Sequence, residues 1–266
     1  RHLGTLEAQI LHALGLRPVW KDGGRVARLD IIPAAELGRP RIDAVIQVTG
    51  LYRDQFDGFL RLLADGIERL SRLDEPGNSI AANSRGALAR LLAAGNAQEA
   101  AEGLASMRIF SNAPGDYTTG LSASVLDSTS WEKDDGLADA FLARTQYAYG
   151  SRGWGIRAEA GNLLAEQLRG VSAATLSRSS NLHGLLSTDH PYEFLGGLSL
   201  AVRRLDGQAP ALYVSDLRRP DARVATAAQF LSDELRARYL NPHWIEGMKR
   251  EGYAGTLEIL NAVNNL

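Results

Sequence analysis

Apolar side chains recur every three or four residues along most of this chain, which is the spacing typical of amphipathic helices. The first such stretch covers residues 5–14, where Leu6, Ile10 and Leu14 share one face. Similar stretches cover 56–70, 80–92, 97–105, 121–126, 137–147, 156–168, 192–205, 224–239, 242–251 and 256–264. The pattern predicts a chain in which helix predominates.

Short apolar segments lie between these helices and predict strands. Residues 26–32 alternate apolar and polar side chains after a turn at 21–24, and 44–49 form a more continuous apolar run. Residues 171–176 and 211–214 are further strands, while 108–117 and 177–191 are predicted to be loops. Strands that alternate with helices indicate a helix-rich mixed α/β fold.

The glycine-rich segment 150–155 is a candidate boundary between two parts of the chain. It follows a predicted helix, whereas a dinucleotide-binding loop follows a strand, so a turn or hinge is favoured. We therefore expect an α/β part with long helices over 1–150 and an α/β part with a polar loop and terminal helices over 151–266. Because the chain starts without Met and stops directly after a helical pattern, we expect a fragment of a large multidomain protein.

Composition and charge exclude several classes of function. The net charge is -2. Nucleic-acid and membrane-surface partners usually require an excess of basic residues, so the charge does not indicate either kind of partner. There is no cysteine, so a bound metal would have to meet His, Asp, Glu or water. No apolar run reaches the roughly 18 residues of a membrane-spanning helix, and we expect a cytoplasmic protein.

The loop at 177–191 holds the strongest candidates for chemistry. His183, Asp189 and His190 lie within eight residues of one another. Imidazole and carboxylate groups bind first-row divalent metals and also accept protons. The alternative is that these are surface side chains that make ordinary hydrogen bonds.

A second set of candidates follows predicted strands and loops. Arg53 and Asp54 come just after the strand that ends near Gly50, a common place for binding residues, and arginine grips carboxylates at two points. Alternatively, Asp54 stabilises a helix N-terminus and Arg53 lies on the surface. Arg108 and Tyr117 flank a loop with Pro and Gly and allow the same two interpretations.

Several ordered motifs resemble the CobN/magnesium-chelatase large-subunit family. They are LGRPRID at 37–43, TGLYRDQF at 49–56, RIF at 108–110, PGDY at 114–117, YAYG at 147–150 and LNPHWIEGMKREGY at 240–253. The resemblance covers nearly the whole chain and is closer to the cobalt branch than to the magnesium branch.

The resemblance implies a section of the tetrapyrrole-binding subunit of an ATP-dependent cobaltochelatase. Such an enzyme inserts Co²⁺ into hydrogenobyrinic acid a,c-diamide during cobalamin biosynthesis, and AAA+ motor subunits of the CobS and CobT type bind ATP and Mg²⁺. The section alone is expected to be inactive. With this family in view, we expect His183, Asp189 and His190 to receive the metal or accept ring protons. The expected substrate-binding residues are Arg53, Asp54, Arg108, Tyr117 and Glu193.

One segment departs from the family pattern. Cobaltochelatases usually carry an acid-rich loop, close to HDLLDSDD, followed by YxxFHGG. Here the loop reads HGLLSTDH at 183–190, followed by YEFLGG at 192–197, so three acids are changed and Leu195 replaces a histidine. The loss of these anionic ligands should weaken the binding of a divalent metal, unless His190 and Glu193 replace them as ligands. The alternatives are a divergent paralogue that binds or carries a tetrapyrrole, or one that inserts Mg²⁺ into, or removes metal from, a porphyrin.

Overall fold

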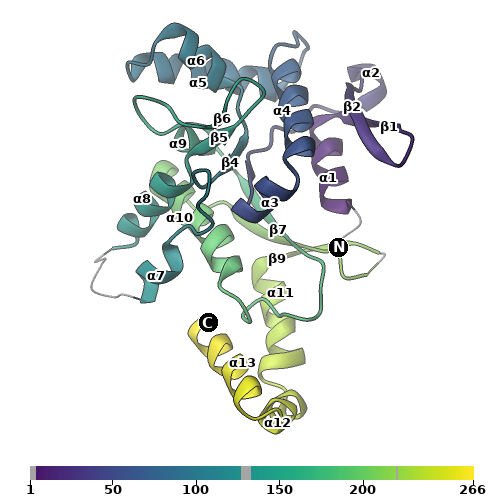
Figure 1. The fold of residues 1–266 in the computed structure, drawn as a ribbon, viewed down its shortest axis with the longest axis vertical. Coiled ribbons are helices and arrows are strands. Elements are labelled where there is room, and N and C mark those ends of the chain that lie inside the picture. The colour runs from purple at the N-terminus through teal and green to yellow at the C-terminus, as the bar shows by residue number, and fades with distance from the viewer. Residues whose placement is uncertain (1–3, 127–132, 220) are drawn as a thin grey trace. The chain divides into compact units, whose positions relative to one another are not determined.

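The computed structural model describes residues 4–126, 133–219 and 221–266 (Figure 1). The chain divides into two compact units. The N-terminal unit comprises Leu6–Gly120 and Asp139–Arg169, and the C-terminal unit comprises Arg1–Thr5, Leu121–Ala138 and Gly170–Leu266. This differs from the expected division at residue 150, because strands on either side of that residue pair with each other.

The N-terminal unit begins with a helix and a β-hairpin. Helix α1 (Thr5–Leu14) has the predicted bounds, and β1 (Leu16–Lys21) pairs antiparallel with β2 (Arg25–Ile31). The predicted turn between them is confirmed: Gly23 and Gly24 have φ of 84° and 72°, which side chains other than glycine rarely adopt. Strand β1 was missed, since Pro18 and two basic residues interrupt its apolar pattern.

A four-stranded sheet of short strands lies at the centre of this unit. Its order is β3 (Ile46–Gln47), β4 (Ile109–Ser111), β5 (Tyr147–Tyr149) and β6 (Trp154–Ile156), with β3 and β4 parallel and the other neighbours antiparallel. The segment at 108–117 was predicted to be a loop, but its first residues form the fully buried strand β4. The predicted strand at 44–49 is shorter than expected.

The remaining helices of this unit are α2 (Ala34–Leu37), α3 (Gly50–Gln55), α4 (Asp57–Ser71), α5 (Ser79–Ala93), α6 (Gln98–Ala105), α9 (Leu163–Leu168) and the part of α8 (Asp134–Thr145) from Asp139 onward. Leu63 and Ile67 of α4 are buried in one core with Leu29, Ile109 and Tyr149. The predicted helix at 156–168 was too long, because β6 and the Asn162 cap delay its start.

The C-terminal unit contains a three-stranded sheet and seven described helices, two of them with wide π-type turns. Strand β7 (Ala173–Arg178) is parallel to β8 (Ala211–Asp216), which pairs antiparallel with β9 (Arg223–Thr226). The helices are α7 (Leu121–Leu126), η1 (Pro191–Gly196), α10 (Gly197–Asp206), α11 (Ala227–Glu234), η2 (Leu235–Tyr239), α12 (Pro242–Arg250) and α13 (Tyr253–Asn264).

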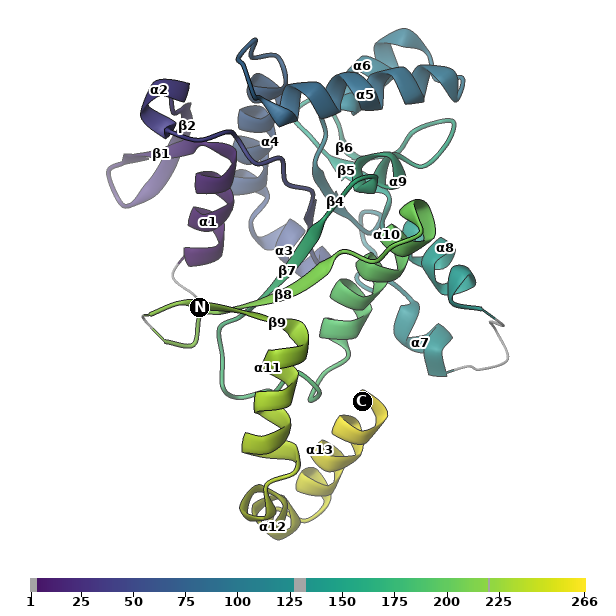
Figure 2. The same cartoon turned by 180° about the vertical axis from the view of Figure 1, so that it is seen from behind.

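After β9, α11 and η2 lead into a helical hairpin of α12 and α13 (Figure 2). The helix predicted over 224–239 therefore begins later than expected, because Val224 and its neighbours extend the sheet as β9. The helix-rich mixed α/β class is confirmed. Within the described residues, none of the helices combines the length and apolar character needed to span a membrane.

Candidate functional site

The loop that joins β7 to η1 carries the candidate metal ligands. The side chain of His183 is exposed, and its main-chain carbonyl accepts a hydrogen bond from Arg178. Asp189 lies with Oδ1 3.1 Å from Nδ1 of His190, and its Oδ2 accepts a hydrogen bond of 2.8 Å from the Ser122 hydroxyl. The structure therefore brings Asp189 and His190 together at one end of the loop.

The metal site expected at His183, Asp189 and His190 stays a prediction. No group of three or more His, Asp or Glu side chains is arranged to hold a metal ion in the parts of the chain that the structure describes. Glu193 follows in η1 and is only 5% exposed, so it faces the interior and not a surface that a ring could contact directly.

The middle of the loop is held in place by α11 and η2. The carboxylate of Glu234 accepts a hydrogen bond from the main-chain N–H of Leu185, and the Tyr239 hydroxyl accepts one of 3.1 Å from Leu186. The same hydroxyl lies 3.1 Å from Oγ of Ser187. These buried contacts fix the turn, while His183 and His190 remain exposed on either side of it.

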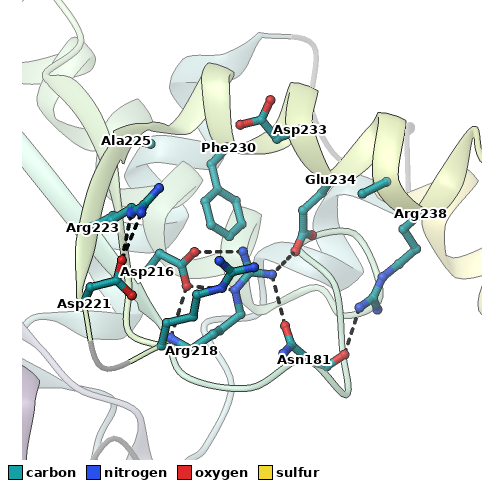
Figure 3. Close-up of a pocket in the computed structure, with 12 residues that line it drawn as sticks. Asn181, Asp216, Arg218, Asp221, Arg223, Ala225, Phe230, Asp233, Glu234 and Arg238 are labelled. Atoms are coloured by element: carbon teal, nitrogen blue, oxygen red, sulfur yellow. Dashed lines mark hydrogen bonds and ion pairs between the residues drawn. The ribbon is translucent and has the colours of Figure 1, made fainter.

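A pocket of about 510 Å³ opens beside this loop, outside the carboxyl ends of the parallel strands β7 and β8 (Figure 3). This is where ligands bind in open α/β sheets. This pocket was not predicted from the sequence, where its signal is the dense run of charges at 218–223 directly after a predicted strand. Its charged lining residues are Asp216, Arg218, Arg219, Asp221, Arg223, Asp233, Glu234 and Arg238.

Arg218 is the fixed centre of this pocket. Its Nε and Nη2 donate to the two carboxylate oxygens of Asp216 at 2.8 and 2.9 Å, and its Nη1 donates to Glu234 at 3.2 Å. The Phe230 ring covers one face of the guanidinium, with Cζ 4.9 Å from the ring centre. The hydrogen bond from Arg218 lowers the pKa of Asp216, and the same contact raises the pKa of Arg218.

In the N-terminal unit, Arg53, Asp54 and Tyr117 come together as one cluster. The Arg53 guanidinium donates to both carboxylate oxygens of Asp54 at 2.7 and 2.9 Å, and to the carbonyls of Asn112 and Ala113 at 3.1 and 3.0 Å. The Tyr117 hydroxyl donates to Asp54 at 2.8 Å. The hydrogen bond from Arg53 lowers the pKa of Asp54. Arg53 is buried and fully engaged, so only Asp54 and Tyr117 offer an accessible surface.

Arg108 occupies a separate buried cluster of the same unit. Its Nε and Nη2 donate to Asp43 at 3.0 and 3.1 Å, Nη1 donates to the carbonyl of Ala105 at 3.0 Å, and Nη2 also reaches Ser84 at 3.1 Å. The side chain has no exposed surface. The expectation that Arg53 and Arg108 hold substrate carboxylates therefore finds no support in this geometry, since neither presents a free donor.

All 266 residues match the family described as CobN/Magnesium Chelatase. This chain belongs to the CobN/magnesium chelatase family. The resemblance inferred from the motifs is thereby confirmed.

Relatives from both branches of the CobN/magnesium chelatase family are similar over almost the whole chain. The aerobic cobaltochelatase subunit CobN of Pseudomonas aeruginosa is 37% identical over 263 residues, which is 97% of this chain and 21% of that protein. The chloroplastic magnesium-chelatase subunit ChlH of Oryza sativa subsp. japonica is 33% identical over 275 residues, which is 98% of this chain and 18% of the relative.

A solved structure has the same fold. The catalytic subunit of cobaltochelatase from Mycobacterium tuberculosis superposes with a TM-score of 0.86 at 35% identity, covering 97% of this chain and 21% of that one. The chain thus spans about a fifth of the length of these members of the CobN/magnesium chelatase family.

Proposed function

We propose that this chain is a section of a chelatase large subunit that takes part in inserting Co²⁺ into a tetrapyrrole, with hydrogenobyrinic acid a,c-diamide as the ring. The observation that carries the proposal is the match over 97% of the chain to aerobic cobaltochelatase subunit CobN. In this chain, the loop that carries the exposed His183 and His190 follows the carboxyl end of β7, which is parallel to β8. This end of a parallel sheet is a favoured place for a ligand.

In this proposal, His183, Asp189 and His190 accept protons from ring nitrogens or guide the entering metal. Imidazole and carboxylate groups are suitable proton acceptors in general acid–base catalysis. The carboxylate of Asp189 is oriented by Ser122 and His190. AAA+ partner subunits of the CobS and CobT type would bind ATP and Mg²⁺ in the cytoplasm. The tetrapyrrole and Co²⁺ would be the substrates of the assembled chelatase.

The test replaces His183 and Asp189 together, as His183→Ala with Asp189→Asn, in the full-length subunit. Cobalt insertion is then followed by the absorbance of the ring in the presence of ATP and the motor subunits. We expect a loss of roughly a hundredfold or more in turnover, the scale of general acid–base catalysis. His243→Ala on α12 is a matched control, because that histidine is also exposed in the C-terminal unit. Insertion at the normal rate by the double variant would remove this loop from the chemistry.

A second candidate is a subunit that binds or carries a tetrapyrrole without inserting metal. The described residues contain no group of three ligands suited to a metal, and three acids of the usual loop are changed. Titration of corrin and porphyrin rings into the full-length chain, with and without ATP and motor subunits, separates the two functions. Ring binding with no turnover of Co²⁺ or Mg²⁺ favours the carrier, whereas turnover with Mg²⁺ and a porphyrin indicates the magnesium branch.

A further inference from the structure

The pocket beside β7 and β8 is lined by four arginines and four carboxylates, but the carboxylates do not pair with all four arginines. Asp216 and Glu234 both bind Arg218, and Asp221 binds Arg223 at 2.9 Å. Asp233 lies 3.9 Å from Arg236 and also accepts a hydrogen bond from Gln229. The four carboxylates of the lining are therefore engaged by Arg218, Arg223 and Arg236, and Asp216 and Glu234 share Arg218.

Three arginines, of which Arg219 and Arg238 line the pocket, make no hydrogen bond or ion pair with a carboxylate in the described part of the chain. Arg238 donates one hydrogen bond of 2.8 Å, to the main-chain carbonyl of Asn181. Arg219 lines the pocket and makes no hydrogen bond or ion pair with any described residue. Arg178, at the end of β7, donates to the carbonyl of His183, and its buried Nε has no hydrogen-bond partner among the described residues.

Arg178 lies among charges of both signs next to this pocket. Burial is the main cause that lowers the pKa of Arg178; Glu234 and Tyr239 raise it, and Arg218 and Arg238 act in the same direction as burial. Phe230, Ala225 and Ala237 supply an apolar part of the pocket lining. An apolar boundary concentrates the field of nearby charges and strengthens the attraction for an anion.

We propose that this pocket binds a small oxyanion, either a carboxylate-bearing or a phosphate-bearing molecule. Arg238 and Arg219 would contact it directly, while Arg218 stays fixed by Asp216 and Glu234. Arginine donors match carboxylate and phosphate oxygens in two-point geometry. A volume of about 510 Å³ lies within the range of small-molecule sites. The site requires no metal, no motor subunit and no ATP, so it goes beyond the chelatase function proposed above.

Isothermal titration of the full-length chain with two probes, inorganic phosphate and citrate, tests this proposal at low ionic strength. We expect heat of binding with at least one probe, and we expect salt to weaken it, because screening reduces charge–charge attraction. Binding of phosphate alone identifies a phosphate-type ligand, and binding of citrate alone identifies a polycarboxylate; either outcome supports the site. No binding of either probe overturns it.

The double variant Arg219→Gln with Arg238→Gln assigns the binding to this pocket. We expect affinity for the probe to fall roughly tenfold or more, as the loss of charged two-point contacts implies, whereas Arg250→Gln, the same kind of charge change on an exposed residue of α12, leaves it unchanged. An unchanged thermal unfolding midpoint shows that the double variant is folded. Equal affinity in the folded double variant and the wild type would place the anion elsewhere and overturn the proposal. Normal cobalt insertion has no bearing on this result, so the two proposals fail separately.

Discussion

The buried carboxylate of Glu234 accepts a hydrogen bond from the main-chain N–H of Leu185, and so ties α11 to the loop that carries His183. Its other oxygen accepts a hydrogen bond of 3.2 Å from Arg218 in the neighbouring pocket. One side chain thereby joins the candidate metal loop to the candidate anion pocket within the C-terminal unit. Glu234 is 6% exposed, which makes both contacts costly to lose.

We expect Glu234→Gln to lower the free energy of unfolding by about 2 kcal/mol, because hydrogen bonds to a buried charged group are among the stronger ones. Urea unfolding of the full-length chain followed by circular dichroism measures this loss. Glu246→Gln is the matched control, since Glu246 pairs with Lys249 on an exposed face and such pairs contribute under about 1 kcal/mol. Equal effects of the two substitutions would contradict a special role for Glu234.

Much of the fold could be predicted because helical periodicity is local. The bounds of α1 were predicted, and those of α4, α5, α6 and α12 were predicted to within about a residue, since their apolar stripes and caps lie within the segment itself. Strands β4 and β9 were not predicted. Three or four residues are too few to show alternation. Strand β4 exists because the distant strands β3 and β5 pair with it, and β9 exists because it pairs back onto β8.

The candidate site was only partly visible for the same reason. His183, Asp189 and His190 are close in sequence, so their common loop could be found. The pocket arginines come from 218–223, after β8, and from 238 in η2, so only the folded chain brings them to one pocket. Arg53 and Arg108 were expected to face a ligand, but charge alone does not distinguish a binding arginine from one buried in a structural cluster.

Arg53→Lys tests that structural assignment. Lysine keeps the charge but cannot bind both oxygens of Asp54 and the carbonyls of Asn112 and Ala113 at once. We expect the free energy of unfolding to fall by about 2 kcal/mol, as for other buried charged hydrogen bonds. Arg17→Lys, in an exposed pair with Glu36, should change it by less than about 0.5 kcal/mol. A stable Arg53→Lys protein that loses ring affinity would instead make Arg53 a binding residue.

Stability should depend on pH through Asp216. Its pKa is lowered in the folded state by the hydrogen bond from Arg218, while an unfolded Asp titrates near about 3.9. The stabilisation is therefore fully present above about pH 4 and is lost as the pH falls through the folded pKa. We expect the stability difference between wild type and Asp216→Asn to be constant from about pH 5 to about pH 7 and to shrink below about pH 4. A difference that persists undiminished at about pH 2 would show that the ion pair is not its source.

The α12–α13 hairpin depends on a close approach at Gly255. A Cβ added there would lie 1.8 Å from the carbonyl oxygen of Met248, whereas one added at Gly247 in α12 would meet no atom within 4 Å. We expect Gly255→Ala to push the helices apart and to lower the free energy of unfolding by about 2 kcal/mol, as overpacking commonly does. Gly247→Ala should raise it by up to about 1 kcal/mol, because alanine favours helix over glycine. Hydrogen exchange at the amides of α13 locates the effect. We expect faster exchange in Gly255→Ala and unchanged exchange in Gly247→Ala. Protection equal to wild type in both variants would show that the helices do not meet at Gly255.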